Sequence, residues 1–244
     1  MTILVTNDDG HTDGAEILLE VAKELNKNSF AIVPNKQRSA TSVALTLHKP
    51  LRLHKLREDF YTLSGTPADI VLFSIYSKKF PKPTLILSGI NSGDNCAEGS
   101  ILSSGTVGAC WKAVIEGIPS IAFSIYREPG DWSKKNPWKD RATIKKYVKQ
   151  IVLELIDKNK PDMFYNVTLP DKLKNAKIIH SKNMQRKRFN ATITERKDPN
   201  GTPYYWLSGD FRQIESGTSL HEVAVKKNIT ITPVHLSFKL GLEK

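Results

Sequence analysis

The sequence predicts an α/β protein in which a mostly parallel sheet is flanked by helices. Two observations support this prediction. Short, apolar, β-branched runs alternate along the first half of the chain with segments in which apolar residues recur at helical spacing. Polar or glycine-containing stretches follow several of the short runs, as expected for loops at the carboxyl ends of parallel strands.

The first strand, helix and second strand follow one another at the start of the chain. Residues 2–6 form a short β-branched run that is typical of a buried strand. Apolar residues between positions 17 and 25 recur at helical spacing, and a second apolar run at 30–33 is stopped by Pro34. These segments predict a strand-helix-strand unit.

The same alternation continues through the first half of the chain. We expect a helix over residues 67–76, a strand over 84–87, a helix over 106–115 and a strand over 120–124. Strands joined through helices form parallel sheets with right-handed crossovers, so this half is predicted to be Rossmann-like. An apolar stripe on the lysine-rich segment 144–155 predicts a further helix that packs against the sheet.

The second half contains shorter β-prone runs that are separated by turns. These runs lie at residues 165–168, 178–179 and 229–232. A turn at 198–201 joins two further β-prone stretches, at 192–194 and 204–206, and predicts a hairpin. Such an exposed arm suits subunit packing or exchange, so we expect C-terminal β-hairpin extensions that are used in oligomerisation.

Length and composition restrict the architecture and the partners. We expect a single domain over residues 1–244, with a Rossmann-like core over 1–125 and a helix plus β-hairpin oligomerisation extension over 126–244. The formal net charge of +11 favours phosphate-bearing ligands and also permits nonspecific binding of nucleic acid. The chain has two cysteines and lacks a long apolar run, so we expect a reduced, cytoplasmic protein with no membrane partner.

The strongest candidate site begins where the first strand ends. Asp8 and Asp9 follow that strand directly and precede Gly10. Two adjacent carboxylates repel each other unless a positive ion lies between them, and Mg²⁺ or Mn²⁺ prefers such oxygen ligands. A plain turn, closed by hydrogen bonds between side chain and backbone, is the alternative that this peptide alone leaves open.

Loops after two further strands carry residues suited to the same chemistry. In the stretch 87–95, Asn91 offers an amide oxygen to a hard cation and Asn95 can donate to a phosphate oxygen. After the second strand, Ser39 can ligate a metal and Arg38 can meet a phosphate. Taken singly, each stretch is equally consistent with an ordinary polar loop.

Ser104, Gly105 and Thr106 stand directly before an apolar helical stretch. Hydroxyls and free backbone N–H groups at a helix N-terminus can bind a phosphate, although a simple helix cap uses the same residue types. Because the carboxyl ends of parallel strands share one edge of a sheet, we expect all these loops to converge there.

Five short motifs follow one another along the first half of the chain: Thr-Asn-Asp-Asp-Gly at 6–10, Arg-Ser at 38–39, Gly-Thr-Pro-Ala-Asp at 65–69, Ser-Gly-Ile-Asn-Ser-Gly-Asp-Asn at 88–95 and Ser-Gly-Thr-Val at 104–107. In this order they resemble the SurE family of metal-dependent survival-protein phosphatases. A weaker likeness continues through 166–170 and 231–233, so the resemblance covers nearly the whole chain. The chain departs from the family at Ala40, where glycine is common, and at Ser219, where an acidic residue usually follows Gly-Thr.

The resemblance implies an enzyme that hydrolyses nucleoside 5′-monophosphates, with 3′-monophosphates as a further substrate class, to nucleoside and inorganic phosphate. It implies that Mg²⁺ or Mn²⁺ is held by Asp8, Asp9, Ser39 and Asn91, with Asp8 and Asp9 also catalytic. It also implies a homodimer or homotetramer whose catalytic core lies in residues 1–125. Some members of the family shorten polyphosphate, which makes an exopolyphosphatase the alternative activity.

Our mechanistic hypothesis is in-line attack on phosphorus by a metal-activated water whose proton passes to Asp8 or Asp9. An aspartyl-phosphate intermediate is the alternative mechanism. Two rivals are non-enzymatic: a nucleotide sensor, and a nucleic-acid-binding protein suggested by the net charge and the basic run at 185–188.

We interpret the loop aromatics as packing residues and leave them out of the site, although they are candidates for stacking on a base. These aromatics are Tyr126, Trp132, Trp138 and Phe189.

Overall fold

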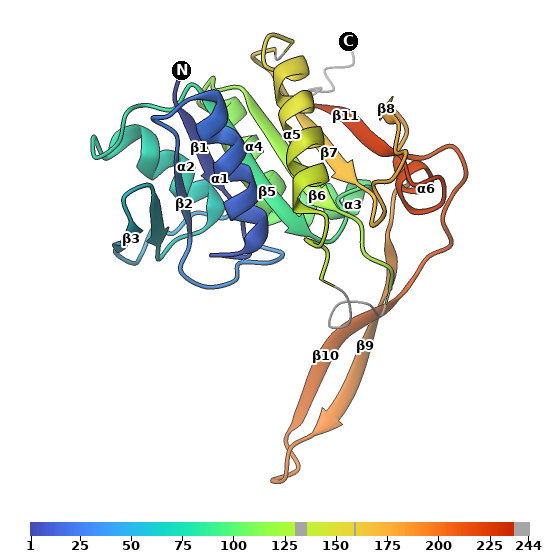
Figure 1. Cartoon of the computed structure of the whole chain (residues 1–244). Helices are drawn as coiled ribbons and strands as arrows, with labels where there is room; N and C mark the ends of the chain where they lie inside the picture. The colour runs from blue at the N-terminus through green and yellow to red at the C-terminus, as the bar shows by residue number, and fades with distance from the viewer. Residues whose placement is uncertain (130–135, 159, 237–244) are drawn as a thin grey trace, which may run out of the picture.

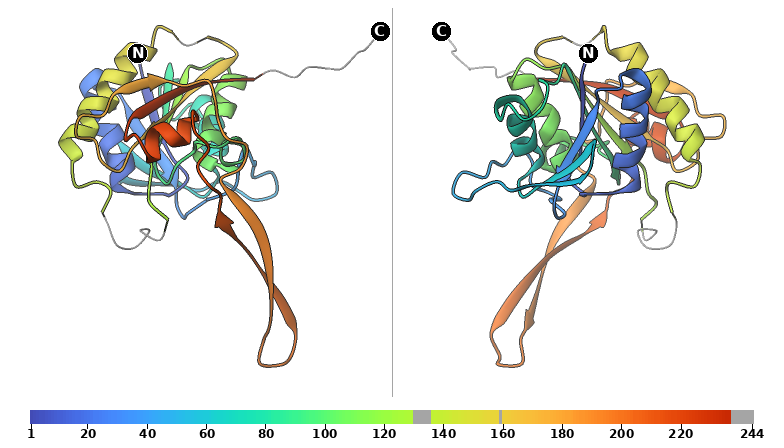
Figure 2. Two further views of the ribbon diagram at one scale, coloured as in Figure 1. Left: turned by 90° about the vertical axis from the view of Figure 1, so that its right-hand side faces the viewer. Right: turned by 60° about the vertical axis from the view of Figure 1, so that its left-hand side comes forward.

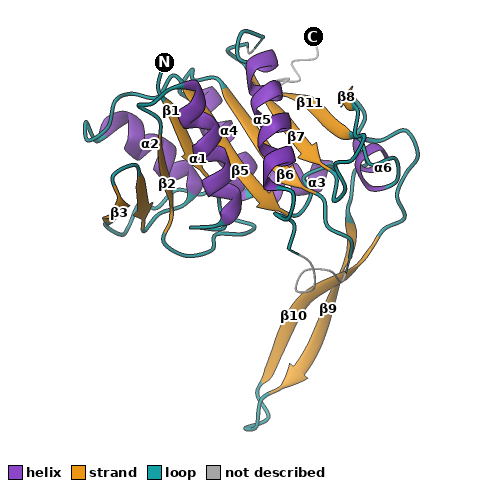
Figure 3. Ribbon diagram, in the orientation of Figure 1, coloured by secondary structure: helices purple, strands orange, loops and turns teal. Residues whose placement is uncertain are grey.

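The computed structural model describes residues 1–129, 136–158 and 160–236. The described residues form a nine-stranded sheet in the order β3-β4-β2-β1-β5-β6-β7-β11-β8 (Figure 1 and Figure 3). Every neighbouring pair from β4 to β7 in this order is parallel, which confirms the predicted mostly parallel α/β sheet. The strands of the sheet are β1 (Ile3–Thr6), β2 (Phe30–Pro34), β3 (Leu53–Arg57), β4 (Phe60–Leu63), β5 (Leu85–Ser92), β6 (Ser120–Ile125), β7 (Met163–Leu169), β8 (Ile178–His180) and β11 (Ile229–His235).

Helices cover both faces of the sheet. Helices α1 (Asp13–Leu25) and α5 (Arg141–Leu155) pack together on the face that is in front in Figure 1, and α2 (Pro67–Tyr76) and α4 (Gly105–Ile115) pack on the opposite face. Short helices α3 (Glu98–Ser103) and α6 (Ser219–Ala224) complete the fold. Among the described residues, no helix has the length and hydrophobicity that a bilayer crossing requires.

Side-chain caps start the helices close to their predicted positions. The Thr12 hydroxyl accepts a hydrogen bond from the backbone N–H of Ala15 and so begins α1. At α2, Thr66 and Asp69 form a reciprocal capping box around Pro67, whose missing N–H costs nothing in the first turn. The helix predicted over 67–76 is therefore confirmed with the same bounds.

The second half of the chain extends the same sheet. Strand β7 lies parallel to β6, and β11 then pairs antiparallel with β7 and parallel with β8. Strand β5 is longer than the predicted 84–87, because a register shift between Ser88 and Asn91 lets it continue to Ser92. The β3–β4 pair was not expected, since β3 is largely exposed at the edge of the sheet and has no apolar run.

The predicted hairpin is a two-stranded arm that leaves the body of the protein. Its strands, β9 (Phe189–Lys197) and β10 (Pro203–Phe211), pair in a continuous antiparallel register, and every one of their residues is exposed. Figure 2 shows the arm projecting far from the sheet in two views. The arm starts on the side of the molecule where the carboxyl ends of the parallel strands lie (Figure 1).

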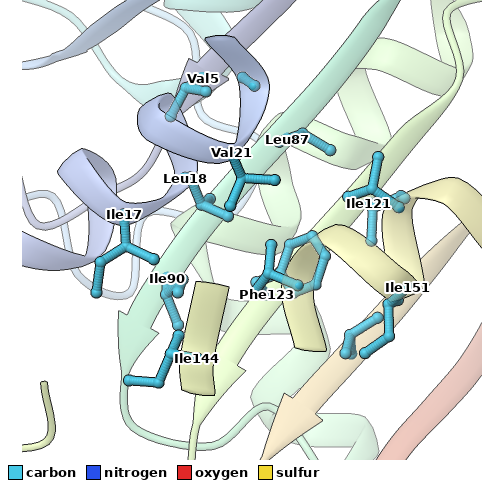
Figure 4. Close-up of a cluster of buried hydrophobic side chains, with 14 of the residues drawn as sticks. Val5, Ile17, Leu18, Val21, Leu87, Ile90, Ile121, Phe123, Ile144 and Ile151 are labelled. Carbon is cyan, nitrogen blue, oxygen red and sulfur yellow. The ribbon is translucent and has the colours of Figure 1, made fainter. Parts of the chain in front are cut away.

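The core beneath α1 is packed too closely to admit another atom at one position. Side chains from α1, α5 and the sheet interlock there, with Ile17 and Leu18 among them (Figure 4). Gly14, in the first turn of α1, lies so near β5 that an added Cβ would stand 2.4 Å from the backbone oxygen of Ile90. Glycine therefore lets the helix approach the strand whose end carries Asn91.

We expect Gly14→Ala to destabilise the protein by about 1–3 kcal/mol, because overpacking against backbone outweighs the better helix propensity of alanine. The matched control is Gly99→Ala at the second residue of α3, where the added Cβ would lie 3.4 Å from the nearest atom, an ordinary contact. Urea unfolding of both variants checks this expectation. Equal midpoints for the two variants would contradict it.

Candidate functional site

A cavity of about 650 Å³ opens at the carboxyl ends of β1, β2 and β5. Asp8 and Asp9 directly follow β1, Ser39 lies in the loop after β2, and Asn91 lies near the end of β5. The polar loops predicted to converge at one sheet edge therefore do so. Of the predicted site residues, the described part of the cavity wall contains Asp8, Asp9, Ser39, Asn91, Asn95 and Ser104.

Asp8 is buried beneath the N-terminus of α4. Its carboxylate accepts a 2.5 Å hydrogen bond from the hydroxyl of Thr106. Gly105 packs so closely that a Cβ there would lie 2.8 Å from the Cβ of Asp8. The backbone oxygen of Asp8 accepts a 2.7 Å hydrogen bond from the backbone N–H of Arg38, which attaches the loop after β2 to the same residue.

The acidic pair lacks a positive partner within the part of the chain that the structure describes. Burial raises the pKa of Asp8 to about 6; the hydrogen bond from Thr106 opposes this shift and the nearby charge of Asp9 adds to it. Burial also raises the pKa of Asp9, against the hydrogen bond from Gln37. The folded chain thus holds two carboxylates whose charged forms are disfavoured, and a bound cation would relieve that penalty.

Oxygen atoms suited to a hard divalent cation surround this acidic pair. The amide nitrogen of Asn91 donates to the backbone oxygen of Gly93 at 2.8 Å, which leaves the amide oxygen of Asn91 as the group available to a metal. The hydroxyl of Ser39 lies in the same cavity wall. Two carboxylates, a hydroxyl and an amide oxygen form the ligand set that Mg²⁺ or Mn²⁺ prefers, so these residues fit such an ion.

The turn considered as an alternative for the acidic motif is also present, but other residues make it. Asn7 donates to the backbone oxygen of Gly10 and accepts from the N–H of Gly10. Gly10 has a φ of +87°, a conformation that glycine adopts without strain. The turn therefore uses Asn7 and Gly10 and leaves both aspartate side chains to the cavity.

Hydrogen-bond donors of the kind that suit a phosphate lie in the same cavity as the acidic pair. The amide nitrogen of Asn95 is buried and has no hydrogen-bond partner among the described residues. The hydroxyl of Ser104 caps α4 by accepting from the N–H of Val107 at 3.2 Å, and the first turn of the helix presents further N–H groups. The hydroxyl of Thr106, predicted to bind phosphate, is instead occupied by Asp8.

The guanidinium of Arg38 is not in this cavity, although the sequence placed it among the phosphate ligands. Its side chain lines a neighbouring pocket and makes a 3.4 Å contact with the backbone oxygen of Ser64.

Of the two departures from the family pattern, Ala40 borders the site cavity with a φ of +58°, a region that favours glycine. Ser219 is buried at the start of α6, where its hydroxyl donates to Ser181 at 2.9 Å.

Sequence reasoning missed the wall that faces the acidic pair. Asp94 and Arg188 form an almost fully buried ion pair at 3.2 Å, and the guanidinium lies 4.5 Å from the ring centre of Phe211.

Trp138 and Phe189, interpreted from sequence as packing residues, also line the cavity, whereas Tyr126 does not. Trp132 lies outside the described residues. The basic run at 185–188 contains Arg188 and was the sequence signal that could have indicated it. Asp94, the acidic partner of Arg188, lies far away in the sequence.

Comparison with known proteins decides the family. The family model "Survival protein SurE" matches residues 3–191. The chain belongs to the SurE family. It is 38% identical to the "5'-nucleotidase SurE" of Thermofilum pendens, over 99% of this chain and 93% of that protein, and 34% identical to the protein of the same name from Hyperthermus butylicus, over 96% of this chain and 85% of that protein.

The structural comparison agrees with the sequence comparison. The crystal structure of the SurE protein from Aquifex aeolicus has a TM-score of 0.79 and 31% sequence identity with this chain. The match covers 98% of this chain and 95% of that one, so the likeness includes the hairpin half. The SurE resemblance inferred from five short motifs is therefore confirmed.

We expect Asp8→Asn to stabilise the metal-free protein at pH 7. The folded-state pKa of Asp8 lies above its unfolded value, so the charged carboxylate opposes folding above pH 6, and this penalty vanishes as the pH falls below about 4. Asparagine keeps the acceptor for Thr106 without the charge. The expected gain at pH 7 is on the order of 2 kcal/mol, or roughly 5 °C in melting temperature.

Thermal melts of both proteins in metal-free buffer at pH 7 and at pH 4.5 check this expectation, and the gain should shrink at about pH 4.5. Added Mn²⁺ should raise the melting temperature of the wild type and leave that of Asp8→Asn unchanged, since binding to the folded state alone is stabilising. A variant that melts below the wild type in metal-free buffer at neutral pH would contradict the assigned penalty.

Proposed function

We propose that this SurE protein hydrolyses nucleoside monophosphates to nucleoside and inorganic phosphate, with the 5′-monophosphates as its main substrates. The observation that carries the proposal is the acidic pair, buried Asp8 and half-buried Asp9, which has no positive partner among the described residues and lies beside the donors of Asn95 and α4. Curated relatives over nearly the whole chain carry the name "5'-nucleotidase SurE". SurE proteins depend on a divalent metal, and we assign Mg²⁺ or Mn²⁺ to this chain.

Each polar residue has a part in the proposed reaction. Asp8, Asp9, Ser39 and Asn91 would hold the divalent ion, which when bound polarises the phosphoryl group and lowers the pKa of water. The buried amide of Asn95 and the N–H groups at the start of α4 bind phosphoryl oxygens and stabilise the negative charge that grows on them. A carboxylate of the acidic pair accepts the proton of the attacking water.

The far wall of the cavity supports a nucleoside as the group attached to the phosphate. Trp138, Phe189 and Phe211 present aromatic surface to the cavity, and Phe189 and Phe211 remain about half exposed. A base that stacks on these rings would bury surface that the chain itself leaves open. Inorganic phosphate or a sugar phosphate would leave this wall unused.

We also propose that two or four copies assemble through the hairpin of the 126–244 extension, while residues 1–125 supply the acidic pair. Apolar side chains such as Ile193, Trp206 and Leu207 are 60–70% exposed along the arm, and a partner would cover them. Cys96 and Cys110 are both buried free thiols, which supports a reduced, cytoplasmic setting.

We expect phosphate release from 5′-nucleoside monophosphates with Mg²⁺ or Mn²⁺ and none with chelator. Asp8→Asn should slow release by more than about 100-fold, because even the outer partners of metal ligands contribute about 10–100-fold. A panel of 5′- and 3′-monophosphates, assayed by inorganic phosphate release, measures both effects and ranks the substrates. Release from polyphosphate alone would favour the exopolyphosphatase, and metal-dependent nucleotide binding without release would favour the sensor.

We expect Phe189→Ala to raise the KM for AMP by about tenfold, since stacking of one base contributes about 1–3 kcal/mol. The KM for ribose 5-phosphate, which has no base, should stay within about twofold. Tyr205→Ala is the matched control, because Tyr205 is an exposed aromatic on the same hairpin that does not line the cavity. Equal changes in KM for both substrates would count against a nucleoside on this wall.

A further inference from the structure

A second cavity, of about 490 Å³, lies on the other side of the loop that follows β2. Five basic side chains line this cavity: Lys36, Arg38, His48, Lys49 and Arg52. No Asp or Glu is among the described residues that line it. The remaining lining residues are neutral, so the cavity concentrates positive charge.

These basic residues also lack the partners that similar residues have elsewhere in the fold. Within the described ranges, none of the five makes an ion pair. By contrast, Arg57 on the adjacent strand β3 pairs with Glu16 and Asp59, and Lys55 pairs with Glu58. Positive charge gathered in one cavity without compensation repels itself, and an anion bound there would remove that repulsion.

Arg38 gives this cavity a fixed element. Arg38 is only partly exposed, and the hydrogen bond from its guanidinium to the backbone oxygen of Ser64 is long at 3.4 Å. The Nε atom is buried without a hydrogen-bond partner among the described residues. A guanidinium with donors to spare at the wall of a basic cavity is suited to bidentate recognition of a phosphate.

The two cavities share the loop at 36–39 as a common wall. Gln37 and Ser39 line the acidic cavity, whereas Lys36 and Arg38 line the basic one. Successive side chains of residues 36–39 therefore lie on opposite sides of the loop backbone. That backbone is held to the acidic site directly, by the hydrogen bond from the N–H of Arg38 to the backbone oxygen of Asp8.

We propose that the basic cavity is a second phosphate-binding site, separate from the acidic cavity and specific for phosphate or linear oligophosphate anions. The charge of its lining selects anions, and the spare donors of Arg38 select the phosphate class among them. The cavity is open to solvent and lies between the loop over 35–52 and Ser64 at the end of β4, and its volume of about 490 Å³ admits one to a few phosphate groups. This inference concerns a different site from the proposed hydrolase centre and does not depend on that activity.

Calorimetric titration of the whole protein with sodium tripolyphosphate in metal-free buffer tests the proposal. Without metal the carboxylates of Asp8 and Asp9 repel anions, and the binding that is lost in a variant of the basic cavity but kept in a control variant reports that cavity. Lys36→Gln/Lys49→Gln should weaken binding by about tenfold or more, because hydrogen bonds between charged partners are the stronger ones. The control Lys27→Gln/Lys160→Gln removes two exposed lysines at the amino ends of β2 and β7, whereas the cavity follows the carboxyl end of β2, and this control should leave affinity unchanged.

The outcomes separate the proposal from its rivals. Equal weakening by both pairs, or no measurable binding to the wild type, would overturn the proposal in favour of general surface charge. Tighter binding of a single-stranded oligonucleotide that is lost in the same variant would overturn it in favour of nucleic acid. A parallel titration with inorganic phosphate identifies the source: equal affinity indicates free phosphate, and much weaker affinity indicates linked phosphates. Failure of nucleotide hydrolysis leaves this metal-free result unaffected.

Discussion

The buried carboxylate of Asp8 is the constraint around which the site is built. Thr106 donates to it from the start of α4, Gly105 lets the helix approach it, and the N–H of Arg38 holds the loop after β2 to its backbone. Each contact positions a segment and none supplies a full positive charge. The fold therefore concentrates negative charge that it does not neutralise, and a cation bound there would relieve that deficit.

The hairpin is connected to the same site through a second buried charge. Arg188 stands just before β9, and its guanidinium lies between Asp94, in the loop that carries Asn91 and Asn95, and the ring of Phe211 at the end of β10. A buried ion pair is costly to break because the remaining charge is left without solvent. The base of the arm is thus held against the loop that carries Asn91 and Asn95.

The sequence predicted the features that depend on residues close together in the chain. It did not predict those that depend on contacts between residues far apart in the chain. Strand and helix periods predicted the parallel sheet, and strand-end motifs predicted Asp8, Asp9 and Asn91, because these features need only neighbours in the chain. Asp94 and Arg188 are 94 positions apart, and nothing in either motif indicates the pairing. The course of β5 to Ser92 depends on an inserted register shift that the composition of residues 88–92 does not reveal.

The loop after β2 explains why Arg38 and Ser39, neighbours in the sequence, line different cavities. The position of Arg38 beside Ser39 suggests a shared ligand, but the two side chains line cavities on opposite sides of the loop. The same separation keeps the guanidinium of Arg38 away from the carboxylates of Asp8 and Asp9. The guanidinium of Arg188 does line the acidic cavity, but it is paired with Asp94, and that of Arg38 lies behind the loop. Neither guanidinium therefore occupies Asp8 or Asp9, and the charge of Arg38 still adds positive potential on the far side of the loop.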